Sequence, residues 1–138
     1  MFNSVVISIQ IDRPYAEVYA FLAEPRNFPS WASNLGDDFV QVNGTDWATT
    51  TRNGRVILRF AVPNAYGILD HAIFREGGTP RTTPMRVIAN GDGAEILYTL
   101  FQRPGMDDAT FKSEAEWITS DFTALKSMLE ALGTNEVT

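Results

Sequence analysis

The chain has 138 residues, of which 44% are hydrophobic and 12% aromatic, as is typical of one globular domain with a core of its own. Its formal net charge of −6 disfavours binding to nucleic acid or to an anionic membrane surface. It has no cysteine, which excludes disulfides, thiolate metal ligands and thiol nucleophiles.

The length predicts a single domain over residues 1–138, and the lack of targeting and membrane-spanning signals predicts that it is cytoplasmic. The N-terminal sequence MFNSVVISIQIDR lacks a basic region followed by a sustained apolar run, so we expect no signal peptide. No apolar run approaches the roughly 20 residues that span a bilayer, so we expect no stable membrane insertion.

A strand and two short helical segments are predicted first. Residues 4–11, SVVISIQI, alternate in polarity, which predicts a strand with one buried face. In the next segment, DRPYAEVYAFLA, Asp12 is placed to cap a helix and Pro14 suits its first turn. Residues 24–33, EPRNFPSWAS, contain two prolines and predict a short, irregular helical turn.

Residues 37–103 are predicted to form antiparallel strands separated by turns. Asn53-Gly54 and Asp92-Gly93 are two-residue hairpin signals, because both positions of such a turn must accept positive φ. The first turn pairs Arg52 with Arg55. The covered faces that follow carry Trp47, Thr49, Thr51, Val56, Leu58 and Phe60 in the first hairpin, and Met85, Val87, Ala89, Ile96, Tyr98 and Leu100 in the second.

Between these hairpins, VPNAYG closes a four-residue loop if Val62 pairs with Gly67. That register places His71, the only histidine of the chain, on the covered face of the sheet. The expected cross-strand pairs are Phe60 with Leu69, Leu58 with His71, Val56 with Ile73 and, on the solvated face, the charge pair Arg59 with Asp70.

A long amphipathic helix is predicted over residues 107–132, since apolar residues recur there at alternating spacings of four and three. Asp107 is placed as its cap and Gly133 as its stop. At 1.5 Å per residue the helix is about 39 Å long, enough to cross a whole sheet. Its stripe consists of Phe111, Ala115, Ile118, Phe122, Leu125, Leu129 and Leu132.

The strand that ends near Asp12, the helix after Pro14 and the segment that ends at Trp31 form the stretch ISIQIDRPYAEVYAFLAEPRNFPSWAS. This stretch resembles the opening of the START-like superfamily, also called SRPBCC. The resemblance extends in element order through the closing DFTALKSMLEAL, and GILDH, PMRV and YTLFQRPGM resemble the polyketide cyclase/dehydrase-like branch.

This resemblance implies an α+β helix-grip fold. A curved antiparallel sheet wraps around the long C-terminal helix, two short helices follow the first strand, and a ligand cavity lies between sheet and helix. Members of the superfamily bind lipids, polyketides, hormones or aromatic compounds. Fold analogy alone does not choose among these ligands.

Such a cavity would be lined by the covered sheet face and the helix stripe. An apolar wall with a few convergent polar groups is typical of small-molecule sites. Alternation equally predicts that the same side chains fill the space as an ordinary core. The candidate ligand-binding residues are Trp47, Thr49, Leu58, Phe60, Leu69, His71, Ile73, Met85, Tyr98 and Phe122.

His71 is the best candidate for a catalytic residue. An imidazole in an apolar pocket has a lowered pKa and is mostly neutral at pH 7. It could then hold a carbonyl or hydroxyl of a ligand, or act as a general base in a cyclisation or dehydration. The alternative is a structural histidine satisfied by a backbone carbonyl or by Thr49.

The sequence therefore predicts binding or transport of a hydrophobic or aromatic small molecule. Two alternatives stay open: a polyketide cyclase/dehydratase-like enzyme that uses His71, and a protein-interaction module with a filled cavity and a large exposed apolar patch. One histidine without cysteine argues against a zinc site, and we expect no metal and no cofactor. A monomer and a homodimer are equally compatible with the sequence.

Overall fold

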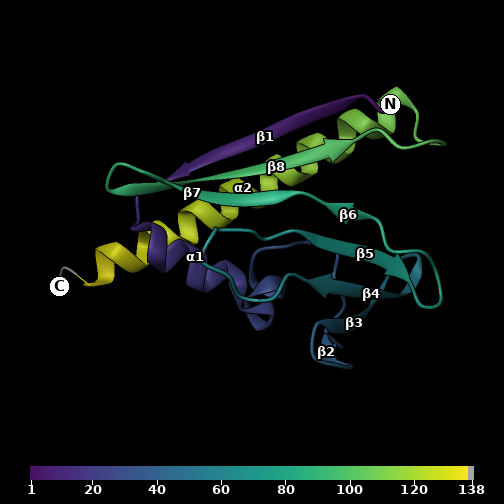
Figure 1. Ribbon diagram of the computed structural model, residues 1–138, viewed down its shortest axis with the longest axis horizontal. Coiled ribbons are helices and arrows are strands. Elements are labelled where there is room, and N and C mark those ends of the chain that lie inside the picture. Colours follow the sequence, from purple (N-terminus) through teal and green to yellow (C-terminus); the bar gives the residue numbers. More distant parts are fainter. Residues whose placement is uncertain (137–138) are drawn as a thin grey trace.

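The computed structural model describes residues 1–136 and has the predicted α+β architecture, with antiparallel sheets and one long C-terminal helix (Figure 1). Short helices follow the first strand, as expected. The elements in chain order are β1 (Ser4–Ile11), α1 (Tyr15–Ala23), the 3₁₀ helix η1 (Pro25–Ser30), β2 (Val40–Gln41), β3 (Asp46–Thr51), β4 (Gly54–Phe60), β5 (His71–Arg75), β6 (Thr82–Thr83), β7 (Met85–Asn90), β8 (Gly93–Phe101) and α2 (Asp108–Glu136).

The strands form two antiparallel sheets that lie next to each other (Figure 1). One has the order β1-β8-β7 and the other the order β2-β3-β4-β5-β6. The chain passes from the second sheet to the first at Pro84, between β6 and β7. Proline has no backbone N–H to donate to a neighbouring strand, so the strand is interrupted there. A bridge between Ile68 and Arg86 links the segment before β5 to β7.

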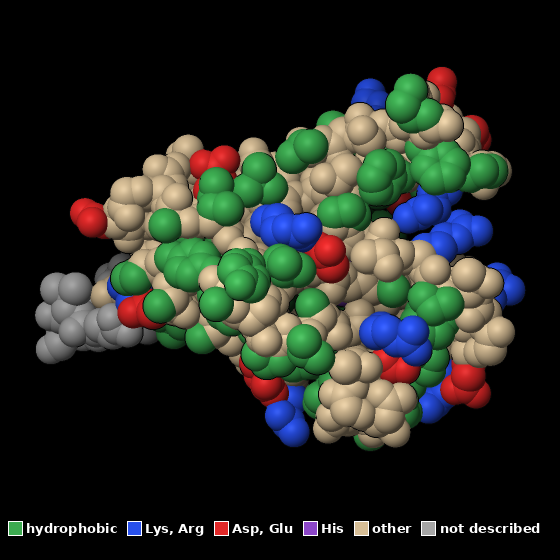
Figure 2. Space-filling model, viewed as in Figure 1, with side chains coloured by type: hydrophobic (Ala, Val, Ile, Leu, Met, Phe, Trp, Pro, Cys, Tyr) green, Lys and Arg blue, Asp and Glu red, His purple; other side chains and the backbone are tan. Residues whose placement is uncertain are grey.

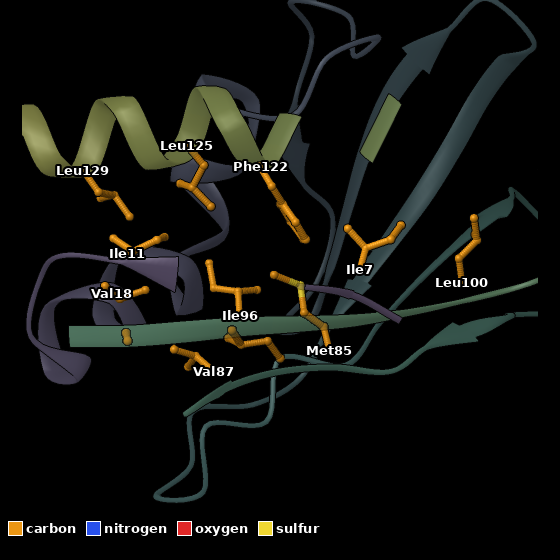
Figure 3. Packing of buried hydrophobic residues seen from close by; sticks show 12 residues of the cluster. Ile7, Ile11, Val18, Met85, Val87, Ile96, Leu100, Phe122, Leu125 and Leu129 are labelled. Atoms are coloured by element: carbon orange, nitrogen blue, oxygen red, sulfur yellow. The ribbon is translucent and has the colours of Figure 1, made fainter. Parts of the chain in front are cut away.

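The main core lies between α2, α1 and the three-stranded sheet. Phe122, Leu125 and Leu129 point from α2 toward Ile11 of β1 and Ile96 of β8 (Figure 3). All five side chains are buried. In the first half of α2, by contrast, the stripe residues Phe111, Ala115 and Ile118 are only half-buried. The helix therefore packs tightly along its second half and leaves room beneath its first half.

All three predicted hairpin registers differ from the observed ones by two residues. Thr51 pairs with Gly54, and Asn90 with Gly93, because in each turn a single glycine takes the positive φ: Gly54 at +102° and Gly91 at +58°. The predicted turns needed two such residues. Because side chains alternate with a period of two, a shift of two residues leaves every predicted face unchanged.

The middle register was predicted wrongly because residues 61–70 do not form a tight loop. Gly67 to Leu69 leave the five-stranded sheet and bond to β7 instead, through Val87 N to Gly67 O (3.0 Å) and Leu69 N to Met85 O (2.9 Å). The predicted partners of Phe60, Leu58, Val56 and Arg59 are therefore replaced by His71, Ile73, Arg75 and Ala72.

The predicted pair of Arg59 with Asp70 does not form. Arg59 instead donates to Asp46 on β3, with Nε 2.8 Å from Oδ1. Asp70 accepts hydrogen bonds from the backbone N–H of Met85 (2.9 Å) and from Arg86. Arg59 and Asp70 are thus each paired with an opposite charge, but not with each other.

Two of the three predicted helix boundaries were wrong. Asp12 does not cap α1, since the residue before the first helical one is Pro14 and no side chain makes a cap hydrogen bond there. Gly133 does not stop α2, which continues to Glu136. A Cβ at position 133 would collide with the guanidinium of Arg13. The glycine therefore leaves room for the Arg13 side chain to lie against α2. The Asp107 cap is confirmed by its hydrogen bond from Thr110 N (2.7 Å).

Candidate functional site

A cavity of about 700 Å³ lies beneath the first half of α2. Its other walls are the segment from η1 to Leu35, the covered face of β4 and β5, and the connection from β5 to β6. The side chains and backbone that line it belong to Phe28, Trp31, Ala32, Ser33, Asn34, Leu35, Thr51, Asn53, Val56, His71, Ile73, Phe74, Arg75, Gly78, Thr79, Arg81, Tyr98, Glu114, Trp117, Ile118, Asp121 and Phe122.

Five of these side chains form a closed ring of aromatic contacts, which we call the aromatic wall. Going round it, ring centroids are separated by 6.3 Å from Phe28 to His71 and by 5.8 Å from His71 to Tyr98. The separations are 5.8 Å from Tyr98 to Phe122, 5.9 Å from Phe122 to Trp31 and 5.1 Å from Trp31 back to Phe28. Edge-to-face and tilted pairs of this kind hold each ring in place.

His71 lies in this wall with only 8% of its surface exposed. Its Nδ1 is 3.1 Å from the carbonyl oxygen of Leu69. Burial lowers the pKa of the imidazole below 6.5, although the Leu69 carbonyl and the charge of Asp70 oppose the shift. The imidazole is therefore neutral at pH 7.

Tyr98 stands beside His71 and supplies the only phenol of the aromatic wall within the described chain. Burial raises the pKa of this phenol, which a hydrogen bond with the side chain of Thr83 partly offsets. The charges of Glu114 and Asp121 raise the same pKa further, since both carboxylates face the cavity. Tyr98 thus remains a neutral phenol over the physiological pH range.

The α2 wall carries polar groups around one indole. Ser33 donates through its Oγ to Asp121 (2.8 Å) and through its backbone N–H to the same carboxylate (3.2 Å). The indole N–H of Trp117 donates to Ser33 Oγ. These contacts tie the segment after η1 to α2. Glu114, one turn before Trp117, is partly buried, and this burial raises the pKa of its carboxyl.

Two residues of the cavity lining from the β5–β6 region are basic. Arg75 at the end of β5 and Arg81 before β6 both contribute to its lining. The cavity therefore has an aromatic wall at its base, carboxylates on the helix side and guanidinium groups on the hairpin side.

Four of the ten candidate residues lie on the cavity: His71, Ile73, Tyr98 and Phe122. The other six do not line it, although they occupy the predicted faces. Trp47 stacks on Phe39, with centroids 5.0 Å apart, and Phe60 packs against Phe28 at 5.4 Å. The remaining four, Thr49, Leu58, Leu69 and Met85, are buried.

Thr49 is covered for a specific reason. Its Oγ1 donates to Asp38 (2.9 Å) and accepts from the backbone N–H of Gly36 (3.1 Å), so the segment before β2 lies across it. Thr49 makes no hydrogen bond to His71, whose ring bonds to Leu69 instead. Contact of these ten residues with a ligand stays a prediction.

Phe28 and Trp31 were missed as lining residues. Both come from the proline-containing segment that was interpreted only as an irregular turn. A signal was present, because residues three apart lie on the same side of a 3₁₀ helix, and Phe28 and Trp31 are three apart. Trp117 and the carboxylates of α2 were missed because they flank the apolar stripe rather than belong to it.

No group of three or more His, Asp or Glu side chains within residues 1–136 could hold a metal ion. Over the same part of the chain, no helix is both long and apolar enough to cross a membrane.

Solved structures share this architecture over nearly the whole chain. A START superfamily protein from Mycobacterium smegmatis has a TM-score of 0.71 at 12% identity, covering 94% of this chain and 98% of its own. Ara h 8.0201 has a TM-score of 0.70 at 14% identity, covering 95% and 99%. CalU16 from Micromonospora echinospora has a TM-score of 0.63 at 14% identity, covering 93% and 74%.

No protein-family model and no curated protein matches the sequence. Identities of 12–14% carry an argument about fold alone, so the chemistry of a ligand has to be argued from the cavity.

Proposed function

From the START-like, helix-grip fold that this chain shares with structures that include polyketide cyclase-like proteins, we propose that it binds a hydrophobic or aromatic small molecule between α2 and β5. The observation that carries the proposal is the aromatic wall at the base of a cavity of about 700 Å³. Small-molecule sites generally have volumes of about 300–1,000 Å³ and combine apolar walls with a few polar groups.

An enzymatic cyclase or dehydratase role has less support. General-base catalysis by His71 would require a titratable partner to orient the imidazole and raise its basicity. In the described chain the Nδ1 of His71 meets a backbone carbonyl, and burial lowers the pKa of the ring. Both features favour a ligand contact over proton abstraction.

A role as a protein-interaction module also has less support. It would be favoured by a filled cavity and a large continuous apolar surface. The cavity beneath α2 is large instead. Figure 2 shows hydrophobic side chains of one face in groups that charged and other side chains interrupt.

Displacement of the neutral dye Nile red tests the proposal. The dye should gain fluorescence on binding, and medium-chain fatty acids or aromatic compounds should displace it. The variant Ile73→Trp fills the cavity from β5 and should weaken dye binding at least tenfold. Native mass spectrometry of freshly purified protein, followed by denaturing extraction, checks for a molecule already bound.

Ile88→Trp is the matched control. Ile88 is 45% exposed and Ile73 is 47% exposed, and both lie on strands, but Ile88 is not part of the cavity. The proposal expects Ile88→Trp to bind the dye like the parent protein. Absence of dye binding together with no aromatic compound retained in native mass spectrometry, or the same loss in both variants, would overturn it.

A further inference from the structure

The tautomer of His71 is determined by the backbone next to it. A carbonyl oxygen can only accept a hydrogen bond, so the Nδ1 that lies 3.1 Å from Leu69 O must carry the proton. In a neutral imidazole the other nitrogen, Nε2, is then an acceptor without a proton.

The position of the Leu69 carbonyl is itself fixed. Leu69 N donates to Met85 O (2.9 Å), and on the following residue Asp70 O accepts from Ala61 N (3.1 Å). The Asp70 side chain also accepts from Met85 N (2.9 Å). The peptides on either side of this carbonyl are thus bonded to β7 and to Ala61, which directly follows β4, so the carbonyl is held in place and Nδ1 stays the donor nitrogen.

The acceptor Nε2 has no hydrogen-bonding partner within residues 1–136, since the Leu69 contact is the one polar contact of this ring. No buried side-chain nitrogen or oxygen of the described chain lacks a partner. Nε2 is therefore accessible. Because His71 lines the cavity, Nε2 is reached from the cavity. A deeply buried side chain thus presents one unpaired acceptor to the ligand space.

The rings that flank His71 restrict what can meet this acceptor. Phe28 and Tyr98 lie at 6.3 Å and 5.8 Å from it, centroid to centroid. A ligand that reaches the aromatic wall displaces water from Nε2. If the ligand has no donor, the acceptor is left buried and unpaired, which is costly.

We infer that His71 selects ligands that present a hydroxyl or N–H donor to its Nε2, so that the preferred class is hydroxylated aromatic or alicyclic molecules rather than plain hydrocarbons or molecules whose polar groups only accept. This inference rests on the proposed function and makes it more specific. A ligand carbonyl, which is compatible with the sequence alone, does not fit this tautomer.

The test compares 2-naphthol with 2-methoxynaphthalene by isothermal titration calorimetry at pH 7.5. The two probes share one ring system and one oxygen, but only 2-naphthol is a donor. The wild-type protein should bind 2-naphthol about tenfold more tightly, the size expected when a buried acceptor is left unpaired. Equal affinities, or absence of binding by both probes, would overturn the inference, whereas the proposed function is decided separately by the dye and mass-spectrometry tests.

Two substitutions assign the preference to Nε2. His71→Asn keeps an amide N–H near the Nδ1 position for Leu69 and removes the acceptor. The ratio of the affinities for 2-naphthol and 2-methoxynaphthalene should therefore fall close to one. His71→Gln extends an amide oxygen toward the Nε2 position and should retain part of the preference. An unchanged preference in His71→Asn would overturn the inference.

Ile73→Val is the control on the same wall. It removes a methyl group and no polar atom, so it should change both affinities by the same factor and leave their ratio unchanged. If His71→Asn does not fold, the wild-type ratio and His71→Gln still decide the question.

Discussion

Gly67 is the residue that directs the chain from the five-stranded sheet toward β7. Its φ is +71°, and a Cβ there would collide with the carbonyl oxygen of Val87. The close approach allows the bond from Val87 N to Gly67 O, which positions the segment leading to His71. A side chain at this position would therefore disturb the cavity as well as the turn.

We expect Gly67→Ala to lower the free energy of unfolding by about 3 kcal/mol, since it combines a strained φ with a backbone collision. Gly77→Ala is the control. Gly77 also has a positive φ, +81°, but a Cβ there would meet nothing within 4 Å. Its cost should be about 1 kcal/mol, from the strained φ alone. Equal losses in urea unfolding would contradict the role given to the Val87 contact.

Because of Asp46, we expect the free energy of unfolding to decrease at acidic pH. Hydrogen bonds from Arg59 hold the pKa of this carboxyl at about 2, below its usual 3.8, against the opposing effect of burial. A lowered folded-state pKa contributes stability that is fully present above the unfolded value and is lost as pH falls toward the folded value. The wild-type protein should therefore lose stability between pH 4 and pH 2.

Asp46→Asn tests this dependence, because the amide does not titrate. The variant should be less stable than wild type at pH 6, and the difference should shrink as pH falls from 4 to 2. Urea unfolding at pH 6, 4, 3 and 2.5 measures both slopes. A difference that stays constant over this range would show that Asp46 is not the titrating group.

At the scale of elements, the two halves of α2 have different tasks. Leu125 is fully buried against the three-stranded sheet, whereas Ile118 is half-buried and lines the cavity. We expect Leu125→Ala to cost about 3 kcal/mol of unfolding free energy, as buried Leu-to-Ala changes do. Ile118→Ala should cost only about 1 kcal/mol, because less apolar surface is covered there. Similar costs for both changes would contradict a cavity beneath the first half of the helix.

The same division explains what the pattern of α2 could not reveal. The alternating spacing of four and three predicted one continuous stripe from Phe111 to Leu132. Periodicity predicts which side of a helix faces the interior of the protein. It does not predict whether other side chains fill the space beneath that side. Leu132 is 49% exposed, and Phe111 is half-buried, although both belong to the stripe.

At the scale of the whole molecule, the fold was predictable because several signals agreed. Alternation gave the covered faces of the strands, and these faces survived even where the register was wrong by two residues. Turn signals were less reliable, since Gly54 and Gly91 serve turns that need only one positive φ.

The candidate site was less predictable. Alternation identifies the covered face of a strand, but not the position along that face at which a cavity lies. Trp47 and Phe60 occupy the predicted face but are covered by Phe39 and Phe28, which come from segments without regular periodicity. The cavity lies instead near the ends of the strands at Thr51, Val56 and Arg75, and it extends to the α2 wall at Trp117. Side-chain volumes from distant segments decide that placement.

The central claim is that the space beneath α2 binds a hydrophobic or aromatic small molecule, and an NMR titration of uniformly ¹⁵N-labelled protein with 2-naphthol tests it most directly. The account predicts amide shifts on both sides of the cavity, at His71 and Ile73 on β5 and at Trp117 and Ile118 on α2. It also predicts that Ile73→Trp abolishes these shifts while Ile88→Trp does not. Shifts that are absent, or confined to the outer surfaces of β1 and β7, would contradict the account.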